Sequence, residues 1–120
     1  MEIDVMATAG TFTVYNATKE PISGFFSHKN NADEAIHVVD LASDTESPAV
    51  EFQSGAGTHD SWYWHSLSVG GIGDYKSCTG CAFYDKDDGK QVQIKVSGTG
   101  TDLKIEIVMP VSSNCGPVNA

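Results

Sequence analysis

Residues 91–109 read QVQIKVSGTGTDLKIEIVM, and their apolar side chains recur at every second position. Alternation with period two is typical of a β-strand that buries one face. We therefore predict strands over residues 91–97 and 102–109. The glycine-rich residues 97–101 between them predict a turn, so that the two strands form an antiparallel hairpin. The side chains expected to face the core are Val92, Ile94, Val96, Leu103, Ile105, Ile107 and Met109.

The rest of the chain shows the same short alternating segments, and no window has apolar side chains at helical spacing. Further strands are predicted at residues 11–16, 22–27, 35–41, 49–53, 61–69 and 81–84. About eight short strands with a turn every 8 to 12 residues or so are typical of a β-sandwich or barrel. We predict an all-β, antiparallel β-sandwich forming a single domain over residues 1–120, with a core at about 11–110 and loose termini.

The net charge of the chain limits the classes of partner that it can bind. Seven lysines and no arginine stand against sixteen carboxylates, for a net charge of -9. Nucleic-acid and phosphate sites are normally built from Arg and Lys, so we exclude nucleic acid; anionic membranes are disfavoured, whereas zwitterionic or neutral headgroups are not. No apolar stretch approaches a membrane-spanning length, and the first four residues are acidic, unlike a signal peptide. We expect a soluble protein, cytoplasmic or secreted without a visible signal peptide.

Residues 58–65 concentrate both tryptophans, one of four tyrosines and two of four histidines. The two faces of the predicted strand carry Trp62 and Trp64 on one side and Tyr63, His65 and Leu67 on the other. If the tryptophans face outward, they form with Asp60 a stacking platform for sugar rings or lipid headgroups. If they fill the core instead, Tyr63 and His65 lie outside. The sequence leaves both arrangements open.

The glycine-rich residues 68–76 predict a flexible loop that ends in an aromatic side chain. A phosphate cradle would need a following helix, which the pattern does not indicate. Asp74 and Tyr75 of this loop, and Tyr84 further on, complete the candidate ligand-binding residues.

Asp85, Asp87 and Asp88 precede Gly89 and form an acidic cluster. Clustered carboxylates can bind calcium through oxygen ligands, although the spacing of a helix-loop-helix calcium loop is absent. Ordinary turn chemistry explains the same residues. Calcium is therefore a possible metal here, and no other cofactor is expected.

Three cysteines, Cys78, Cys81 and Cys115, allow at most one intramolecular disulfide. Cys115 could pair with either of the others and hold the C-terminal segment; alternatively, all three are reduced thiols. The Cys78–Cys81 spacing also fits zinc or redox chemistry, but zinc needs two more ligands and a redox pair needs a helix N-terminus.

We expect that this protein is not an enzyme. The Gly-x-Ser-x-Gly elbow is missing, and a hydrolase would depend on His59 or His65 with Asp60. Residues 16–18 match the glycosylation pattern, which matters only in a secreted protein.

The order of several motifs resembles that of the "up-regulated in Daf" domain family. These are residues 14–16 leading into 23–25, then Asp60-Ser61-Trp62-Tyr63-Trp64, then residues 84–89 before an alternating strand. More loosely, the layout over about residues 11–110 is similar to aegerolysins and actinoporins, β-sandwiches that dock on lipid headgroups through exposed aromatics. The resemblance implies membrane or glycan recognition through the Trp62-Tyr63-Trp64 cluster, without the amphipathic N-terminal helix that actinoporins insert.

Two functions are therefore expected from the sequence. The first is a non-enzymatic recognition protein of a defence, toxin or stress type that binds lipid headgroups or glycans through Trp62, Tyr63, Trp64, Tyr75 and Tyr84, with carboxylates orienting polar groups. The alternative is a calcium-stabilised structural or protein-interaction domain that forms a homodimer along an edge strand.

Overall fold

The predicted hairpin is the centre of the larger of two sheets. In the computed structural model, which describes residues 8–54, 60–99 and 101–120, it consists of β8 (Gln91–Thr99) and β9 (Asp102–Val108), paired antiparallel. The side chains predicted to face the core are all buried, none of them more than 5% exposed. The period-two pattern therefore assigned this hairpin and its buried face correctly.

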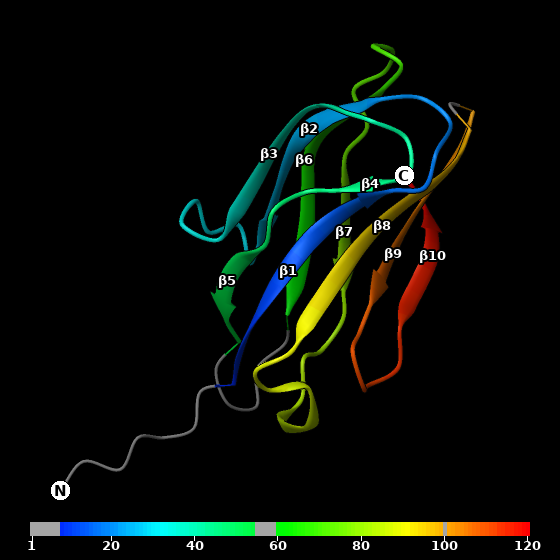
Figure 1. Ribbon diagram of the computed structural model, residues 1–120. Coiled ribbons are helices and arrows are strands. Elements are labelled where there is room, and N and C mark those ends of the chain that lie inside the picture. Colours follow the sequence, from blue (N-terminus) through cyan, green and yellow to red (C-terminus); the bar gives the residue numbers. More distant parts are fainter. Residues whose placement is uncertain (1–7, 55–59, 100) are drawn as a thin grey trace, which may run out of the picture.

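Six strands make up this sheet, which Figure 1 shows from its outer side. Its other members are β1 (Ala9–Asn16), β4 (Thr45–Glu46), β5 (Val50–Gln53) and β10 (Cys115–Asn119). The order is β10-β9-β8-β1-β4, and β5 pairs with the first half of β1. All pairings in it are antiparallel except that of β1 with β8, which is parallel.

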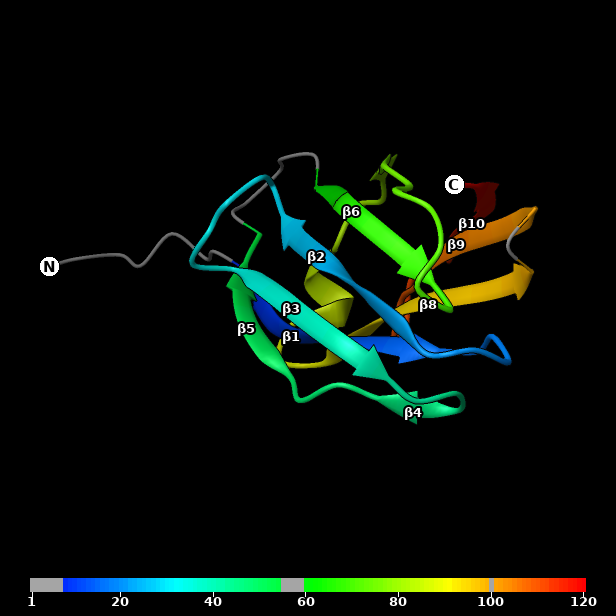
Figure 2. The same cartoon turned by 90° about the horizontal axis from the view of Figure 1, so that it is seen from above.

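The second sheet has four antiparallel strands in the order β3-β2-β6-β7. They are β2 (Ile22–His28), β3 (Ala35–Leu41), β6 (Ser61–Val69) and β7 (Ser77–Gly80). Figure 2 shows the two sheets as separate layers. The predicted β-sandwich is therefore confirmed as the fold class.

Aromatic rings fill the space between the layers. Phe12 of β1 contacts Phe26 of β2 and Trp62 of β6, with ring centroids 5.9 and 5.7 Å apart. Phe52 of β5 meets the same Trp62 edge to face at 5.2 Å. Because all four rings are at most 2% exposed, they tie β1 and β5 of one sheet to β2 and β6 of the other.

A β-bulge in β6 changes which side chains face the core. Phe26 pairs with Trp64 and Phe25 with Ser66, so His65 is an extra residue on its strand. Beyond the bulge the alternation is shifted by one position, and Leu67 is 1% exposed in the core. The prediction that Leu67 shares a face with Tyr63 is therefore wrong.

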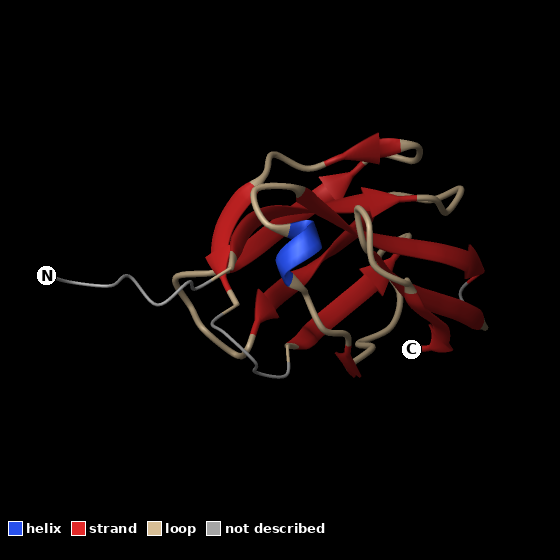
Figure 3. Cartoon of the chain, turned by 90° about the horizontal axis from the view of Figure 1, so that it is seen from below, coloured by secondary structure: helices blue, strands red, loops and turns tan. Residues whose placement is uncertain are grey.

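Other differences concern the ends of the sandwich. The strand predicted at residues 81–84 is wrong: β7 lies just before it, and the backbone N–H groups of Cys81 and Phe83 bond to Asp60 rather than to a strand. The 3-10 helix η1 (Asp85–Asp87) follows and lies across this end of the sandwich (Figure 3). Strands β10 and β4 were not predicted, and β4 lies between the strands predicted at residues 35–41 and 49–53. In the part of the chain that the structure describes, no helix is long and apolar enough to cross a membrane.

Candidate functional site

Four rings lie together on the outer face of the four-stranded sheet. They are Phe25 of β2, His37 of β3, and Tyr63 and His65 of β6, and we name them the outer ring cluster. Ring centroids of Phe25 lie 6.1 Å from His37 and 5.3 Å from His65, and His65 stacks on Tyr63 at 5.8 Å. His37 is exposed and the other three are partly exposed, so the cluster spans three adjacent strands at the surface.

The surroundings of the cluster are polar but almost uncharged. The four strands of this sheet hold one carboxylate, Asp40, and no lysine, although the chain has sixteen carboxylates and seven lysines. Serine hydroxyls take the place of charges, and the Ser27 hydroxyl bonds to His65 Nε2 at 2.7 Å. An aromatic surface depleted in charge is the composition found at the centre of binding interfaces.

The tryptophans are not part of this surface. Trp62 is fully buried and Trp64 is 2% exposed, because the face of β6 that carries them packs against the six-stranded sheet. The arrangement in which the tryptophans form an exposed platform is therefore wrong. The alternative arrangement, in which the tryptophans fill the core and Tyr63 and His65 lie outside, is confirmed. Of the four candidate ligand-binding residues in the aromatic segment, namely Asp60, Trp62, Tyr63 and Trp64, Tyr63 alone lies on the outer face.

Asp60 was predicted to orient a ligand, but its side chain is completely buried. Its Oδ1 lies 2.7 Å from His28 Nε2, and its Oδ2 accepts hydrogen bonds from the Ser54 hydroxyl at 2.8 Å and the Phe83 N–H at 2.9 Å. The second nitrogen of His28 lies 2.8 Å from a Glu34 oxygen. Both ring nitrogens of His28 therefore lie within hydrogen-bond distance of a carboxylate oxygen.

The electrostatics of Asp60 follow from these contacts. Burial raises the pKa of its carboxyl, but the hydrogen bonds from His28, Phe83 and Ser54 together outweigh burial and hold the pKa below the usual value. The contacts of Asp60 with His28, Ser54 and Phe83 connect β2 to the end of β5 and to the segment after β7. His59, the other histidine considered for a hydrolase, lies outside the described residues.

The glycine-rich segment forms a tight turn beyond β6. Val69 and Ile72 exchange two backbone hydrogen bonds, and Gly70 and Gly71 between them have φ of 60° and 76°, which glycine adopts at low cost. The exposed Asp74 pairs with Lys76 at 2.8 Å. Tyr75 is half-buried against the core, and the remaining candidate, Tyr84, is 59% exposed near the opposite end of the sandwich. These residues do not lie on the strands of the outer ring cluster.

The acidic cluster does not converge on a metal position. Asp87 is completely buried and accepts hydrogen bonds from the N–H groups of Tyr84, Val111 and Ser112 at 2.9–3.0 Å, and from the Ser112 hydroxyl. Asp88 instead accepts from the backbone of Ala9. Within residues 8–54, 60–99 and 101–120, no group of three or more His, Cys, Asp or Glu side chains could hold a metal ion. Asp87 therefore organises the turn, and the structure gives no support for Asp85, Asp87 and Asp88 as joint calcium ligands.

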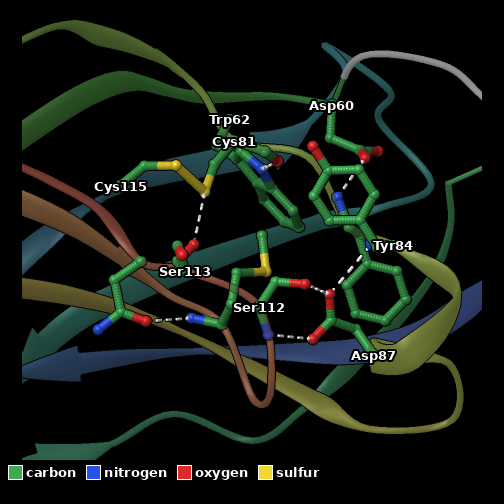
Figure 4. The surroundings of a disulfide bond; sticks show 11 residues. Asp60, Trp62, Cys81, Tyr84, Asp87, Ser112, Ser113 and Cys115 are labelled. Atoms are coloured by element: carbon green, nitrogen blue, oxygen red, sulfur yellow. Dashed lines mark hydrogen bonds between the residues drawn. A yellow bond between two sulfur atoms is a disulfide. The ribbon is translucent and has the colours of Figure 1, made fainter.

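The cysteines form one disulfide, between Cys81 and Cys115 (Figure 4). Cys78 is exposed and free. The interpretation as three reduced thiols is wrong, and the pairing ties the C-terminal strand to the segment after β7. The same segment holds the core through its backbone, since the Cys81 carbonyl accepts a hydrogen bond from Trp62 Nε1 at 2.9 Å.

The side chain of Asn16, the residue that would carry a glycan, is held by hydrogen bonds within the protein. Asn16 is fully buried, and its side-chain nitrogen donates to the carbonyls of Glu20 and Leu41 at 2.8 and 2.9 Å. Its oxygen accepts from Thr18. In the folded protein this amide is not available to a sugar-transferring enzyme.

Phe25 and His37 were missed as candidate site residues. The signal was present, since each lies at a position that alternation within its predicted strand assigns to the outer face. What the sequence lacked was the order of the strands, which places β3, β2 and β6 side by side.

The comparisons with known proteins add no relative: no family model matches the sequence, and no curated protein matches it.

Proposed function

We propose that this protein is a non-enzymatic recognition domain that binds neutral sugar rings, on a glycan or on a glycolipid headgroup, through the outer ring cluster. The observation that carries the proposal is the clustering of Phe25, His37, Tyr63 and His65 on adjacent strands with almost no charge among them. Flat rings accept the apolar face of a sugar, while serine and imidazole groups bond to its hydroxyls.

The charge of the molecule supports a neutral ligand. At a net charge of -9, a phosphate or sulfate group is repelled at long range, and the strands of the four-stranded sheet hold no lysine that could compensate. A neutral sugar loses no ionic hydration on this surface. Its affinity comes from ring stacking and hydrogen bonds.

The family resemblance enters the proposal with one change. The "up-regulated in Daf" family, the aegerolysins and the actinoporins led us to expect aromatic recognition at a membrane, centred on residues 62–64. Because the two tryptophans are buried, we assign the contact to Tyr63 and its neighbours across the sheet. The disulfide fits an oxidising compartment, which is where surface glycans are met.

The test uses two ligand sources and a matched pair of variants. Wild-type protein is applied to an array of neutral glycans and to phosphatidylcholine vesicles with and without a neutral glycolipid. Tyr63→Ser removes a ring of the cluster, and Tyr84→Ser removes an exposed tyrosine outside the four-stranded sheet. Near-UV circular dichroism checks that both variants are folded.

We expect binding to glycans or to glycolipid vesicles that is lost at least tenfold in Tyr63→Ser and kept in Tyr84→Ser. Binding to the array alone identifies a free glycan, and binding to glycolipid vesicles alone identifies a headgroup. Absence of binding in both arms, equal binding to plain vesicles, or full retention in Tyr63→Ser would overturn the proposal.

A second candidate function is self-association through β3. This strand lies at the edge of its sheet, and its Val39 is 71% exposed. Uncovered edge strands with exposed apolar side chains are common sites of strand pairing between chains. Light scattering after size-exclusion chromatography tests it: a dimer that Val39→Lys converts to monomer supports this function, and a monomer at all concentrations rejects it.

A further inference from the structure

Three buried polar atoms gather on the inner side of β6 and β7. They are Trp64 Nε1, Ser77 Oγ and Thr79 Oγ1, and none has a hydrogen-bond partner among the residues that the structure describes. Trp64 is 2% exposed and Thr79 is 7% exposed, and the Ser77 hydroxyl is buried although the residue is partly exposed, so bulk water does not reach the three atoms. They lie at the side of the sandwich where β7 is the edge strand, away from the outer ring cluster.

The strand register places the three residues next to one another on one face. Trp64 is directly opposite Ser77, and Thr79 follows two positions later on the same face of β7. Residues opposite one another in an antiparallel pair have Cβ atoms about 5 Å apart, and diagonal neighbours about 7 Å. The next pair gives the contrast: Trp62 is opposite Thr79, but its Nε1 donates to the Cys81 carbonyl at 2.9 Å.

Buried polar groups without a hydrogen-bond partner strongly destabilise the folded state. Removing a polar group from water without replacing its hydrogen bond lowers the folding equilibrium constant roughly fivefold or more. Three such groups side by side multiply this loss, and native interiors very rarely tolerate it. The indole can only donate, whereas each hydroxyl can donate and accept, so one small molecule with both capacities can satisfy all three.

We infer that an ordered water molecule is bound inside the protein at this position, accepting from Trp64 and bridging to Ser77 and Thr79. Buried waters typically make about three hydrogen bonds to groups that would otherwise lack partners. The site matches this in number and in donor-acceptor character. Through these hydrogen bonds the water connects β7, a strand of only four residues, to the neighbouring strand β6.

Water-selective nuclear Overhauser spectroscopy on the ¹⁵N-labelled wild-type protein tests the inference directly. We expect a cross-peak of a long-lived water at the indole N–H of Trp64 and none at that of Trp62, which serves as an internal control. No cross-peak at Trp64, or equal cross-peaks at both indoles, would overturn the inference.

A variant provides an independent measurement. Thr79→Val keeps the shape of the side chain and removes the hydroxyl; Thr99→Val makes the same change at an exposed position. If the hydroxyl holds a water, the unfolding equilibrium constant rises roughly fivefold in Thr79→Val and the Trp64 cross-peak weakens. A more stable Thr79→Val protein would show that the hydroxyl was an unpaired group, which contradicts the inference. If the variant does not fold, the spectrum of the wild-type protein still decides.

Discussion

Replacing Asp60 removes a buried carboxylate that joins three separate segments of the chain. Its oxygens receive hydrogen bonds from His28, Ser54 and the backbone of Phe83, all between 2.7 and 2.9 Å. Asp60→Ala leaves these three donors buried without this partner, and because each lost buried hydrogen bond costs about 1–3 kcal/mol, we expect a total loss of about 3–5 kcal/mol. Asp60→Asn keeps one acceptor oxygen, which can still receive the bonds of Ser54 and Phe83, so we expect roughly half that loss.

Urea unfolding followed by tryptophan fluorescence measures the loss, since both tryptophans are buried in the folded state. With a slope of about 2 kcal/mol per molar urea, Asp60→Ala lowers the midpoint by about 1.5–2.5 M. The control is Asp74→Ala, which removes an exposed carboxylate paired with Lys76. We expect it to change stability by less than about 1 kcal/mol.

The pH dependence separates the charge from the packing. The pKa of Asp60 is lower in the folded protein than its ordinary value, so its stabilisation is fully present above the ordinary value and is lost as the pH falls through the folded value. The gap between wild type and Asp60→Asn therefore narrows as the pH falls below about 4. Equal losses in the Asp60→Ala and Asp74→Ala proteins, or a gap that does not change with acidification, would refute this reasoning.

Three other changes test the remaining structural assignments. Cys115→Ser should lower stability by about 4 kcal/mol, because it opens a disulfide that closes 34 positions of chain, whereas Cys78→Ser should have no effect in the same denaturation assay. Asp87→Asn should lower the melting temperature by roughly 10 °C, because its carboxylate holds the turn, and calcium should not shift the wild-type melting temperature in scanning calorimetry. Gly24→Ala should reduce the yield of folded protein, because a Cβ there would lie 2.2 Å from a carbonyl oxygen of β6; Gly80→Ala, with no atom within 4 Å, should be neutral, and equal yields would contradict the register.

Local pattern predicted most of the strands because side-chain alternation is a property of the strand itself. The segments at residues 91–97, 102–109 and 35–41 needed no information from elsewhere in the chain. The strand predicted at residues 81–84 failed for a tertiary reason: Asp60, distant in sequence, takes the backbone N–H groups there. Strand β10 was missed because its pairing depends on β9 and on the Cys115 bridge.

The candidate site was less predictable than the fold. Composition singled out the aromatic strand at residues 61–69, but its tryptophans are buried, so the outer face of this strand carries Tyr63 and His65 instead. Asp60 and Asp87 were selected as polar surface groups, yet both are buried acceptors that hold loops. A carboxylate that organises a loop and one that meets a ligand have the same sequence signature, since both occur among turn residues.

By itself the sequence determined that apolar and polar side chains alternate along the strands, that the chain is strongly acidic, and that it can form at most one intramolecular disulfide. These three properties follow from residue identity and spacing alone. Only the tertiary structure decided which face of β6 is covered, where the bulge shifts the alternation, and which cysteine pairs with Cys115. Each of those outcomes depends on what packs against a strand from another part of the chain, and period-two alternation is symmetric with respect to that choice.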